Sequence, residues 1–217
     1  MCIRDSATTG QPPDGTLGES VFDTATVSGS PFTPTGTVTY TFTGQLASLT
    51  PPAGWTVVDA TTWTDTVTLS GGLAPNSLAT PPLPAGSYQF QAAYSGDANY
   101  TDATSAVEPL NMGPGSSNTA TVILDALTHQ APTSTLGEAV LDTATVSGSP
   151  LTPTGTVTYT FTGQLAGLTA PPSWTVVNAT TWTDTVTLSG GLVPNSPLTP
   201  ALPWLMVRGS RALVDGL

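Results

Sequence analysis

The chain has 217 residues, only 8% of which are charged, and fourteen acidic residues against three basic ones give a formal net charge of −11. A surface this acidic repels the phosphates of nucleic acids and anionic membranes, so we expect neither as a partner. No apolar run is long enough to cross a bilayer, so we expect no membrane insertion of this segment. With Cys2 as the only cysteine, a disulfide framework and a thiolate metal site are excluded. Short alternating runs of Thr, Val, Tyr and Trp predict an all-β fold.

Residues 1–6, MCIRDS, differ in composition from residues 7–203. They contain Cys2 and Arg4, whereas the other basic residues, Arg208 and Arg211, lie near the C-terminus. The six letters match the translation of a transposon-end sequencing adapter read as ATG-TGT-ATA-AGA-GAC-AG. We therefore interpret residues 1–6 as a non-native, adapter-like leader. We expect it to have no partner strand and to be removable without loss of stability.

The next stretch, residues 7–115, contains runs with the alternation of antiparallel strands. The predicted strands include residues 20–29, 36–44, 65–71 and 87–96. In GTVTYTFTG, apolar side chains alternate with threonines, so one face is expected to be buried and the other solvated. The residues predicted on buried sides are Val38, Tyr40, Phe42, Phe90 and Tyr94. About seven such strands in about 100 residues are typical of an immunoglobulin-like sandwich.

Residues 16–84 recur as residues 135–203, without a gap and with 57 of 69 positions identical. The repeat predicts two modules, residues 7–115 and 116–203, both truncated. We expect the first to lack its first strand, which the second copy carries as residues 119–126. The second is expected to lack its last strands, because the match ends at Pro203.

Residues 204–217 form the last segment, and we interpret them as a frameshifted tail. Codons for Pro-Trp-Leu-Met, read one base later, permit Gly-Ser-Trp, close to the Gly-Ser-Tyr at the same place in the first copy. We expect this tail to be irregular or to fill a vacated strand position. An incomplete second module would expose core residues such as Val157, Tyr159 and Phe161.

The segments PTGTVTYTF, VTLSGG, LPAGSYQFQAAYSGDANY and SAVEPLNM, taken together, resemble bacterial immunoglobulin-like repeat domains of large secreted or surface proteins. The resemblance covers nearly all of residues 16–112 and part of 117–203. It implies tandem immunoglobulin-like β-sandwich modules, non-catalytic and without a cofactor, that serve as extracellular or cell-surface stalks, spacers or adhesive units. The implied partners are neighbouring modules of the same chain and surface glycans or proteins. Family members often carry a cysteine where this chain has Val107, so we expect no such disulfide here.

Candidate catalytic residues are few. His129 is the only histidine, so neither a Ser-His-Asp triad nor a two-histidine metal site can be assembled from this chain. We expect it to be a loop residue. Carboxylates recur in pairs such as Asp23/Asp142 and Asp65/Asp184, which we place at strand starts, where they would serve turns.

Three further patterns could bind a ligand. Asp97, Asn99 and Asp102 make an oxygen-rich hairpin loop that could hold Ca²⁺, although the spacing matches no EF-hand and these residues also favour turns. Trp55, Trp63, Trp174 and Trp182 are either a sugar-stacking platform or core anchors. A threonine row at residues 37, 39, 41 and 43 resembles an ice-binding face, but one such strand per module is not a flat array, and threonine is common on solvent-facing strands.

These patterns predict a non-catalytic structural or adhesive fragment of an extracellular bacterial protein. The alternative is a carbohydrate-binding accessory array attached to a secreted enzyme. Neighbouring gene sequence would separate the two, because a hydrolase domain favours the second and further repeats with an anchor favour the first.

Overall fold

The chain folds into two compact units, unit 1 (Met1–Gly115) and unit 2 (Ser116–Leu217). The structure is a computed structural model that describes residues 2–203 and 210–215. Every regular element in this part of the chain is a β-strand, so the predicted all-β class is confirmed. Over the same residues, no helix is present that could cross a membrane.

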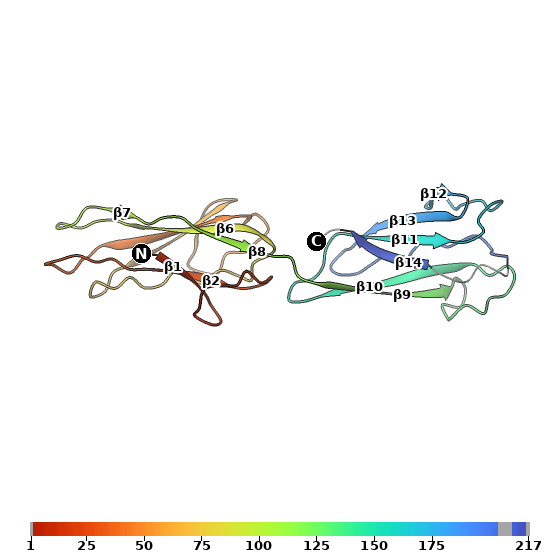
Figure 1. Cartoon of the computed structure of the whole chain (residues 1–217), viewed down its shortest axis with the longest axis horizontal. Helices are drawn as coiled ribbons and strands as arrows, with labels where there is room; N and C mark the ends of the chain where they lie inside the picture. Colours follow the sequence, from red (N-terminus) through yellow and green to blue (C-terminus); the bar gives the residue numbers. More distant parts are fainter. Residues whose placement is uncertain (1, 204–209, 216–217) are drawn as a thin grey trace. The chain divides into compact units, whose positions relative to one another are not determined.

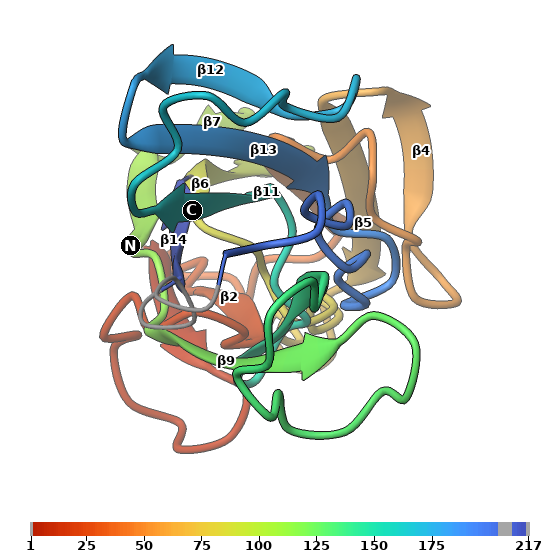
Figure 2. The ribbon, with the colours of Figure 1, turned by 90° about the vertical axis from the view of Figure 1, so that its right-hand side faces the viewer.

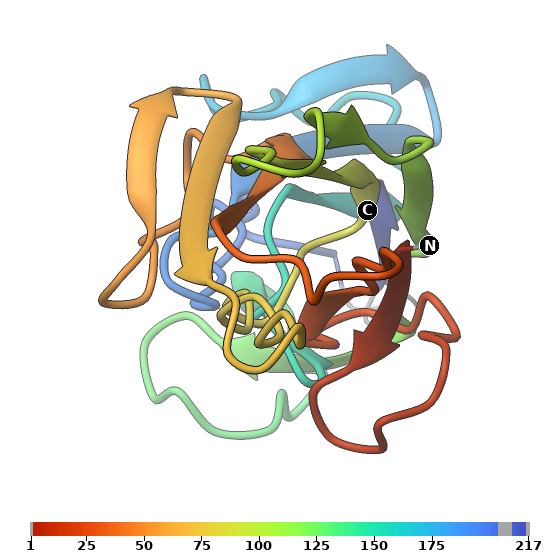
Figure 3. The ribbon, with the colours of Figure 1, turned by 90° about the vertical axis from the view of Figure 1, so that its left-hand side faces the viewer.

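Unit 1 is a sandwich of two antiparallel layers (Figures 1 and 3). One layer is the pair β1–β2, and the other has the order β4-β5-β3-β6-β7, with β8 also paired to β6. In Figure 3 the red strands β1 and β2 lie in the lower layer, and the light-orange hairpin β4–β5 lies at the edge of the upper one. The strands are β1 (Cys2–Ser6), β2 (Val21–Ala25), β3 (Thr37–Gly44), β4 (Thr56–Asp59), β5 (Thr62–Thr68), β6 (Gly86–Tyr94), β7 (Ala103–Thr104) and β8 (Glu108–Met112).

Unit 2 repeats this plan with a layer of β9 and β10 and a layer ordered β12-β13-β11-β14. Figure 2 shows β11, β13 and β12 side by side in one layer, with β9 in the other. The strands are β9 (Ser117–Asp125), β10 (Val140–Gly148), β11 (Thr156–Thr162), β12 (Thr175–Asn178), β13 (Thr181–Thr187) and β14 (Ser210–Asp215).

The core of each unit lies between its layers. Alternation along β3 buries Val38, Tyr40 and Phe42, and alternation along β6 buries Phe90 and Tyr94. All five predicted core residues are therefore confirmed. Val21 of the opposite layer packs in one cluster with Phe42 and Phe90. Val38, Tyr40 and Tyr94 form a second cluster, against which Ala25 and Val27 pack.

The predicted strands are present with shorter or shifted bounds. Residues 20–29 narrow to β2, and the strand predicted at 65–71 begins and ends three residues earlier as β5. The shift follows from a tight turn before β5, where Asp59 Oδ1 accepts hydrogen bonds from Thr61 N (2.7 Å) and Thr61 Oγ1 (2.8 Å).

Residues 76–84 complete the β1–β2 layer without forming a regular strand. Ser77 N and Thr80 N donate to the carbonyls of Asp23 and Val21, both at 2.8 Å. In return, the hydroxyls of Ser77 and Thr80 accept from Asp23 N (2.8 Å) and Val21 N (3.1 Å). Because residues 76–84 form no regular ladder with β2, the acceptors for these two β2 amides are side-chain hydroxyls, not main-chain carbonyls.

Residues 1–6 do not behave as predicted. Cys2–Ser6 forms β1, which pairs with β2 from Cys2↔Ala25 to Ser6↔Val21. At the repeat offset, unit 2 has the same register between β9 and β10, ending in Asp125↔Val140. The expectation that the leader has no partner strand is therefore wrong, because residues 2–6 take the place that β9 has in unit 2. A sheet edge presents N–H and C=O groups that an extended segment can satisfy whatever its side chains.

The end of the chain takes one of the two predicted courses. Ser210–Asp215 forms β14 on β11, with Val157↔Val214, the place that β6 holds on β3. The other residues of the tail, 204–209 and 216–217, lie outside the described residues. Val157, Tyr159 and Phe161 are buried, so the predicted exposure of these three is wrong. Their face is covered by Val140 and Val146 of β10 and by Leu202.

Candidate functional site

The four tryptophans are core residues. Trp55 and Trp63 are 7% and 2% exposed, and Trp174 and Trp182 repeat these values. Both indoles of unit 1 pack at 6.2 Å from the ring of Phe42, measured between ring centroids. Trp55 Nε1 donates to Ala79 O at 3.2 Å, which satisfies its only polar group. Because stacking on a sugar requires an exposed ring face, the sugar-platform hypothesis is wrong and the core-anchor interpretation holds.

Asp97 ties a loop together through both of its carboxylate oxygens. Its Oδ1 accepts from Asn99 N (2.7 Å) and Tyr100 N (2.9 Å), and its Oδ2 accepts from Thr35 N (2.7 Å) and Thr35 Oγ1 (2.9 Å). The hydrogen bond from the Thr35 amide is the main cause that lowers the pKa of Asp97 to about 2. This carboxylate connects the loop after β6 to the segment before β3.

The calcium hypothesis gains no support from this geometry. The oxygens of Asp97 are occupied by four donors from the protein itself, so they are poorly placed to bind a cation as well. Within residues 2–203 and 210–215, no group of three or more His, Cys, Asp or Glu side chains is placed to hold a metal ion.

Asp23 and Asp65 lie in the interior, not at strand starts as predicted. Asp23 is central in β2 and 0% exposed, and Asp65 is central in β5 and 8% exposed. Asp65 Oδ2 accepts from Leu78 N at 2.8 Å, and the residue pairs across strands with Tyr40. The hydroxyl of Tyr40 donates to Pro75 O at 2.9 Å. These polar side chains hold residues 75–78 against the sheet.

The residues of unit 2 that correspond to Asp23, Tyr40 and Asp65 are Asp142, Tyr159 and Asp184. Their surroundings differ at one position. Pro197 replaces Leu78, so the N–H that reaches Asp65 in unit 1 has no counterpart at Asp184. Burial raises the pKa of Asp184. Burial, with the nearby charge of Asp142, raises the pKa of Tyr159 to about 12. The Tyr159 hydroxyl donates to Pro194 O at 2.8 Å, so its proton serves a structural bond.

His129 lies in the exposed loop between β9 and β10. Its amide donates to Asp125 O at 2.9 Å, and its φ of 55° lies in the left-handed region. The counterpart in unit 1 is Gly10, with φ 63°, so a tight turn is common to both units.

The threonine rows are broader than predicted. β5 adds a second row beside that of β3, with pairs from Thr37↔Thr68 to Thr43↔Thr62, and unit 2 repeats the arrangement. The hydroxyls of Thr39 and Thr66 lie 2.9 Å apart and hydrogen-bond to each other. The expectation of one threonine strand per module is therefore wrong.

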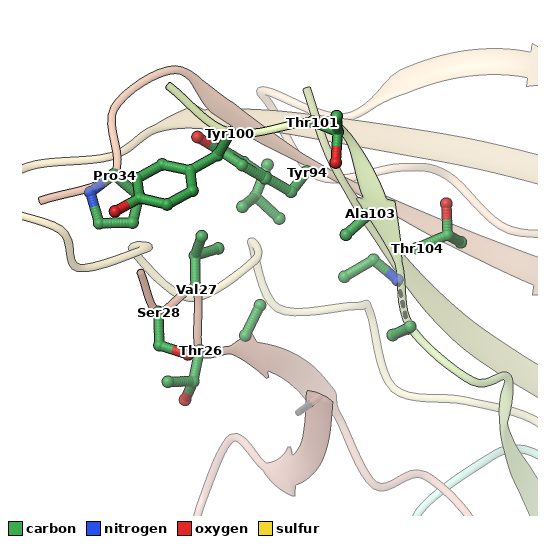
Figure 4. Close-up of a pocket in the computed structure, with 13 residues that line it drawn as sticks. Thr26, Val27, Ser28, Pro34, Tyr94, Tyr100, Thr101, Ala103 and Thr104 are labelled. Carbon is green, nitrogen blue, oxygen red and sulfur yellow. Dashed lines mark hydrogen bonds between the residues drawn. The ribbon is translucent and has the colours of Figure 1, made fainter. Parts of the chain in front are cut away.

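A groove in unit 1 is the feature that the sequence reasoning missed (Figure 4). It has a volume of about 340 Å³ and lies between residues 25–28, which include the end of β2, and residues 103–105, which include β7. Figure 4 shows Thr26 and Val27 on one side, Ala103 and Thr104 on the other, and the ring of Tyr100 near one end.

Comparison of the chain with protein-family models, with curated proteins and with solved structures gives no match.

Proposed function

We propose that this chain is a non-catalytic structural or adhesive segment of an extracellular bacterial protein, built from immunoglobulin-like modules that act as stalk, spacer or binding unit. The observation that carries the proposal is the recurrence of one set of strand registers in two units that each enclose a core. Thr37↔Thr68 recurs as Thr156↔Thr187, and Ser6↔Val21 recurs as Asp125↔Val140. Repeated units with separate interiors are the basis of an extended array.

The order of the strands supports the immunoglobulin-like assignment. In unit 1, β1, β2 and residues 76–84 form one layer, opposite a layer in which β5, β3, β6 and β8 are neighbours. This matches the A-B-E and C′-C-F-G layers of such sandwiches. The extracellular bacterial setting depends on the sequence resemblance alone. The carbohydrate-binding alternative is not proposed, because the tryptophans that suggested it are core residues.

Single-molecule force extension of the full chain tests this function. A load-bearing array should give two unfolding events, each releasing on the order of 30 nm, since about 100 residues extend by ~3.3–3.6 Å each. Phe42→Ala should weaken one event and leave the other unchanged, and Phe161→Ala should give the converse result. A single event, or extension without discrete events, would contradict the proposal.

A further inference from the structure

Threonine occupies every outward-facing position of two neighbouring strands in each unit. In unit 1 the pairing of β3 with β5 places eight threonines in cross-strand pairs, from Thr37↔Thr68 to Thr43↔Thr62. This register runs without a bulge, unlike that of β4 with β5. In unit 2 the pairing of β11 with β13 repeats the arrangement, and we call each set of eight a threonine ladder.

The ladder lies on the solvent side of its sheet. The side chains between the threonines, such as Tyr40, are buried between the layers, so the threonines point away from the interior. The hydroxyls of Thr39 and Thr66 hydrogen-bond to each other at 2.9 Å, and those of Thr158 and Thr185 do the same at 2.9 Å. In such a pair the accepting hydroxyl keeps its own hydrogen, and both oxygens can accept one more bond. The bond therefore fixes the side chains and leaves them able to bind a partner.

The positions that flank the ladder of unit 1 are also uncharged. Beside β3, the outward positions of β6 are Gln89, Gln91 and Ala93. Asp59 ends β4 at one corner, where its Oδ1 accepts from the turn that follows, and the corresponding residue of unit 2 is the neutral Asn178. In a chain with a net charge of −11, a neutral face of this extent suits a neutral partner and has no group that would attract an ion.

A neutral partner of such a face is a glycan or ice, and the ladder suits ice better. Glycan sites use an exposed aromatic ring, whereas the ladder has none and Trp63, between its threonines, is 2% exposed. Ice presents oxygens that each donate and accept, as a threonine hydroxyl does. Neighbouring strands lie about 4.7–4.9 Å apart and alternate residues about 6.4–6.8 Å apart, which are spacings near repeat distances of the ice lattice. The methyl groups between the hydroxyls are apolar and order the adjacent water.

The twist of the sheet limits a flat surface to about the width of the ladder. Adjacent strands are rotated by about 20–25°, so rows that spread over many strands diverge from a plane. The threonines occupy β3 and β5 and give way to glutamine on β6. Strand propensity explains threonine in a strand, but valine, isoleucine and tyrosine share that propensity, and none of them stands at any of the eight positions.

We propose that the two threonine ladders are ice-binding surfaces, with the hydroxyls of β3 and β5, and of β11 and β13, as the groups that contact the lattice. The inference goes beyond the proposed function, since a stalk or spacer needs no ligand. The second ladder gives one chain two surfaces of the same kind, so a variant must alter both units to remove the activity.

Inhibition of ice recrystallisation by the full chain tests the proposal. The wild type should inhibit it and should be incorporated into slowly growing ice. Thr66→Lys with Thr185→Lys places one charge on each ladder at an exposed position, and at least tenfold more of this variant should be needed for the same inhibition. The matched control is Thr50→Lys with Thr169→Lys, which adds the same charges at exposed residues outside the strands and should act as the wild type does.

Near-UV circular dichroism reports that each variant is folded. Should the first variant unfold, Thr68→Lys with Thr187→Lys, at the exposed end of each ladder, is measured in its place with the same expectation. Three outcomes would overturn the inference: a wild type without activity on ice, equal activity in the wild type and the ladder variant, or retention on insoluble cellulose that only the ladder variant loses. The force measurement does not involve this surface, so failure of ice binding is distinguishable from failure of the proposed function.

Discussion

Leu78→Pro in unit 1 tests whether a main-chain N–H stabilises a buried carboxylate. The change removes the donor that lies 2.8 Å from Asp65 Oδ2. The backbone can accept proline here, because unit 2 has Pro197 at the same position and keeps the neighbouring bonds. Ser196 N still donates to Asp142 O at 2.9 Å, and Ser196 Oγ to Pro197 O at 3.1 Å.

The expected magnitude follows from two opposing effects. Asp65 is 8% exposed, so losing a hydrogen bond to its charged form costs about 1.5–3 kcal/mol. Proline also lowers the conformational entropy of the unfolded chain, which stabilises the folded state by about 0.4–1 kcal/mol. Leu78→Ala is the matched control, because it removes the same side chain and keeps the N–H. We expect Leu78→Pro to be less stable than Leu78→Ala by about 1–2 kcal/mol in its free energy of unfolding.

The reciprocal change in unit 2 is Pro197→Ala, which supplies an N–H to Asp184. Alanine is preferred to leucine, because Leu78 lies over Gly54 in unit 1, whereas unit 2 has Ser173 there. A new donor should lower the pKa of Asp184, which burial raises in the wild type. The pKa of Asp184 is 3.8 in the unfolded chain and higher in the folded one, so the folded state holds its proton more tightly. Unit 2 therefore loses stability as pH rises from 3.8 through the folded pKa. Pro197→Ala should reduce that loss.

Urea unfolding monitored by NMR, which resolves both units, measures these differences, and a carboxyl titration follows Asp184. The unmutated unit of each variant is the internal control. Equal stabilities for Leu78→Pro and Leu78→Ala would refute the reasoning, because the N–H would then contribute nothing. An unchanged pKa of Asp184 in Pro197→Ala would refute the same reasoning for unit 2.

Three other predictions concern unit 1. Because the folded pKa of Asp97 is about 2, its ionised side chain contributes fully to the stability of unit 1 above pH 3.8, and this contribution is lost as pH falls through 2. Asp97→Asn should remove this acid dependence, which is measured as urea midpoints from pH 5 to pH 2. Phe42→Ala deletes a ring that is 0% exposed and should cost about 3–5 kcal/mol in chemical denaturation, whereas Phe32→Ala, at 60% exposure, should change stability by less than about 0.5 kcal/mol. Deleting Met1–Ser6 removes β1 from one side of β2, while residues 76–84 remain on the other, and should lower the unfolding free energy by more than about 1 kcal/mol. An unchanged value would show that β1 contributes nothing.

The sequence by itself determined the all-β class and the inward face of the strands. Alternation fixes which side chains of β3 are buried, because a strand places successive residues on opposite faces. Tyr40 and Phe42 were therefore predictable as core residues, and the threonines between them as the outer face. The internal repeat likewise predicted that whatever one copy forms, the other can form too.

Only the tertiary structure decided the roles of the other candidate residues. Trp55 and Asp65 have side chains that suit a binding site as well as an interior, and only the second layer of the sandwich shows that both are enclosed. Asp97 could have been a metal ligand until the segment before β3 supplied Thr35 as its donor, 62 residues away in the sequence.

The outcome at the chain's ends also depended on long-range pairing. Periodicity describes one strand at a time, whereas a sheet edge selects partners by its free N–H and C=O groups, which every residue but proline carries. Residues 2–6 and 210–215 match no repeat pattern, yet each pairs with a strand edge of its unit.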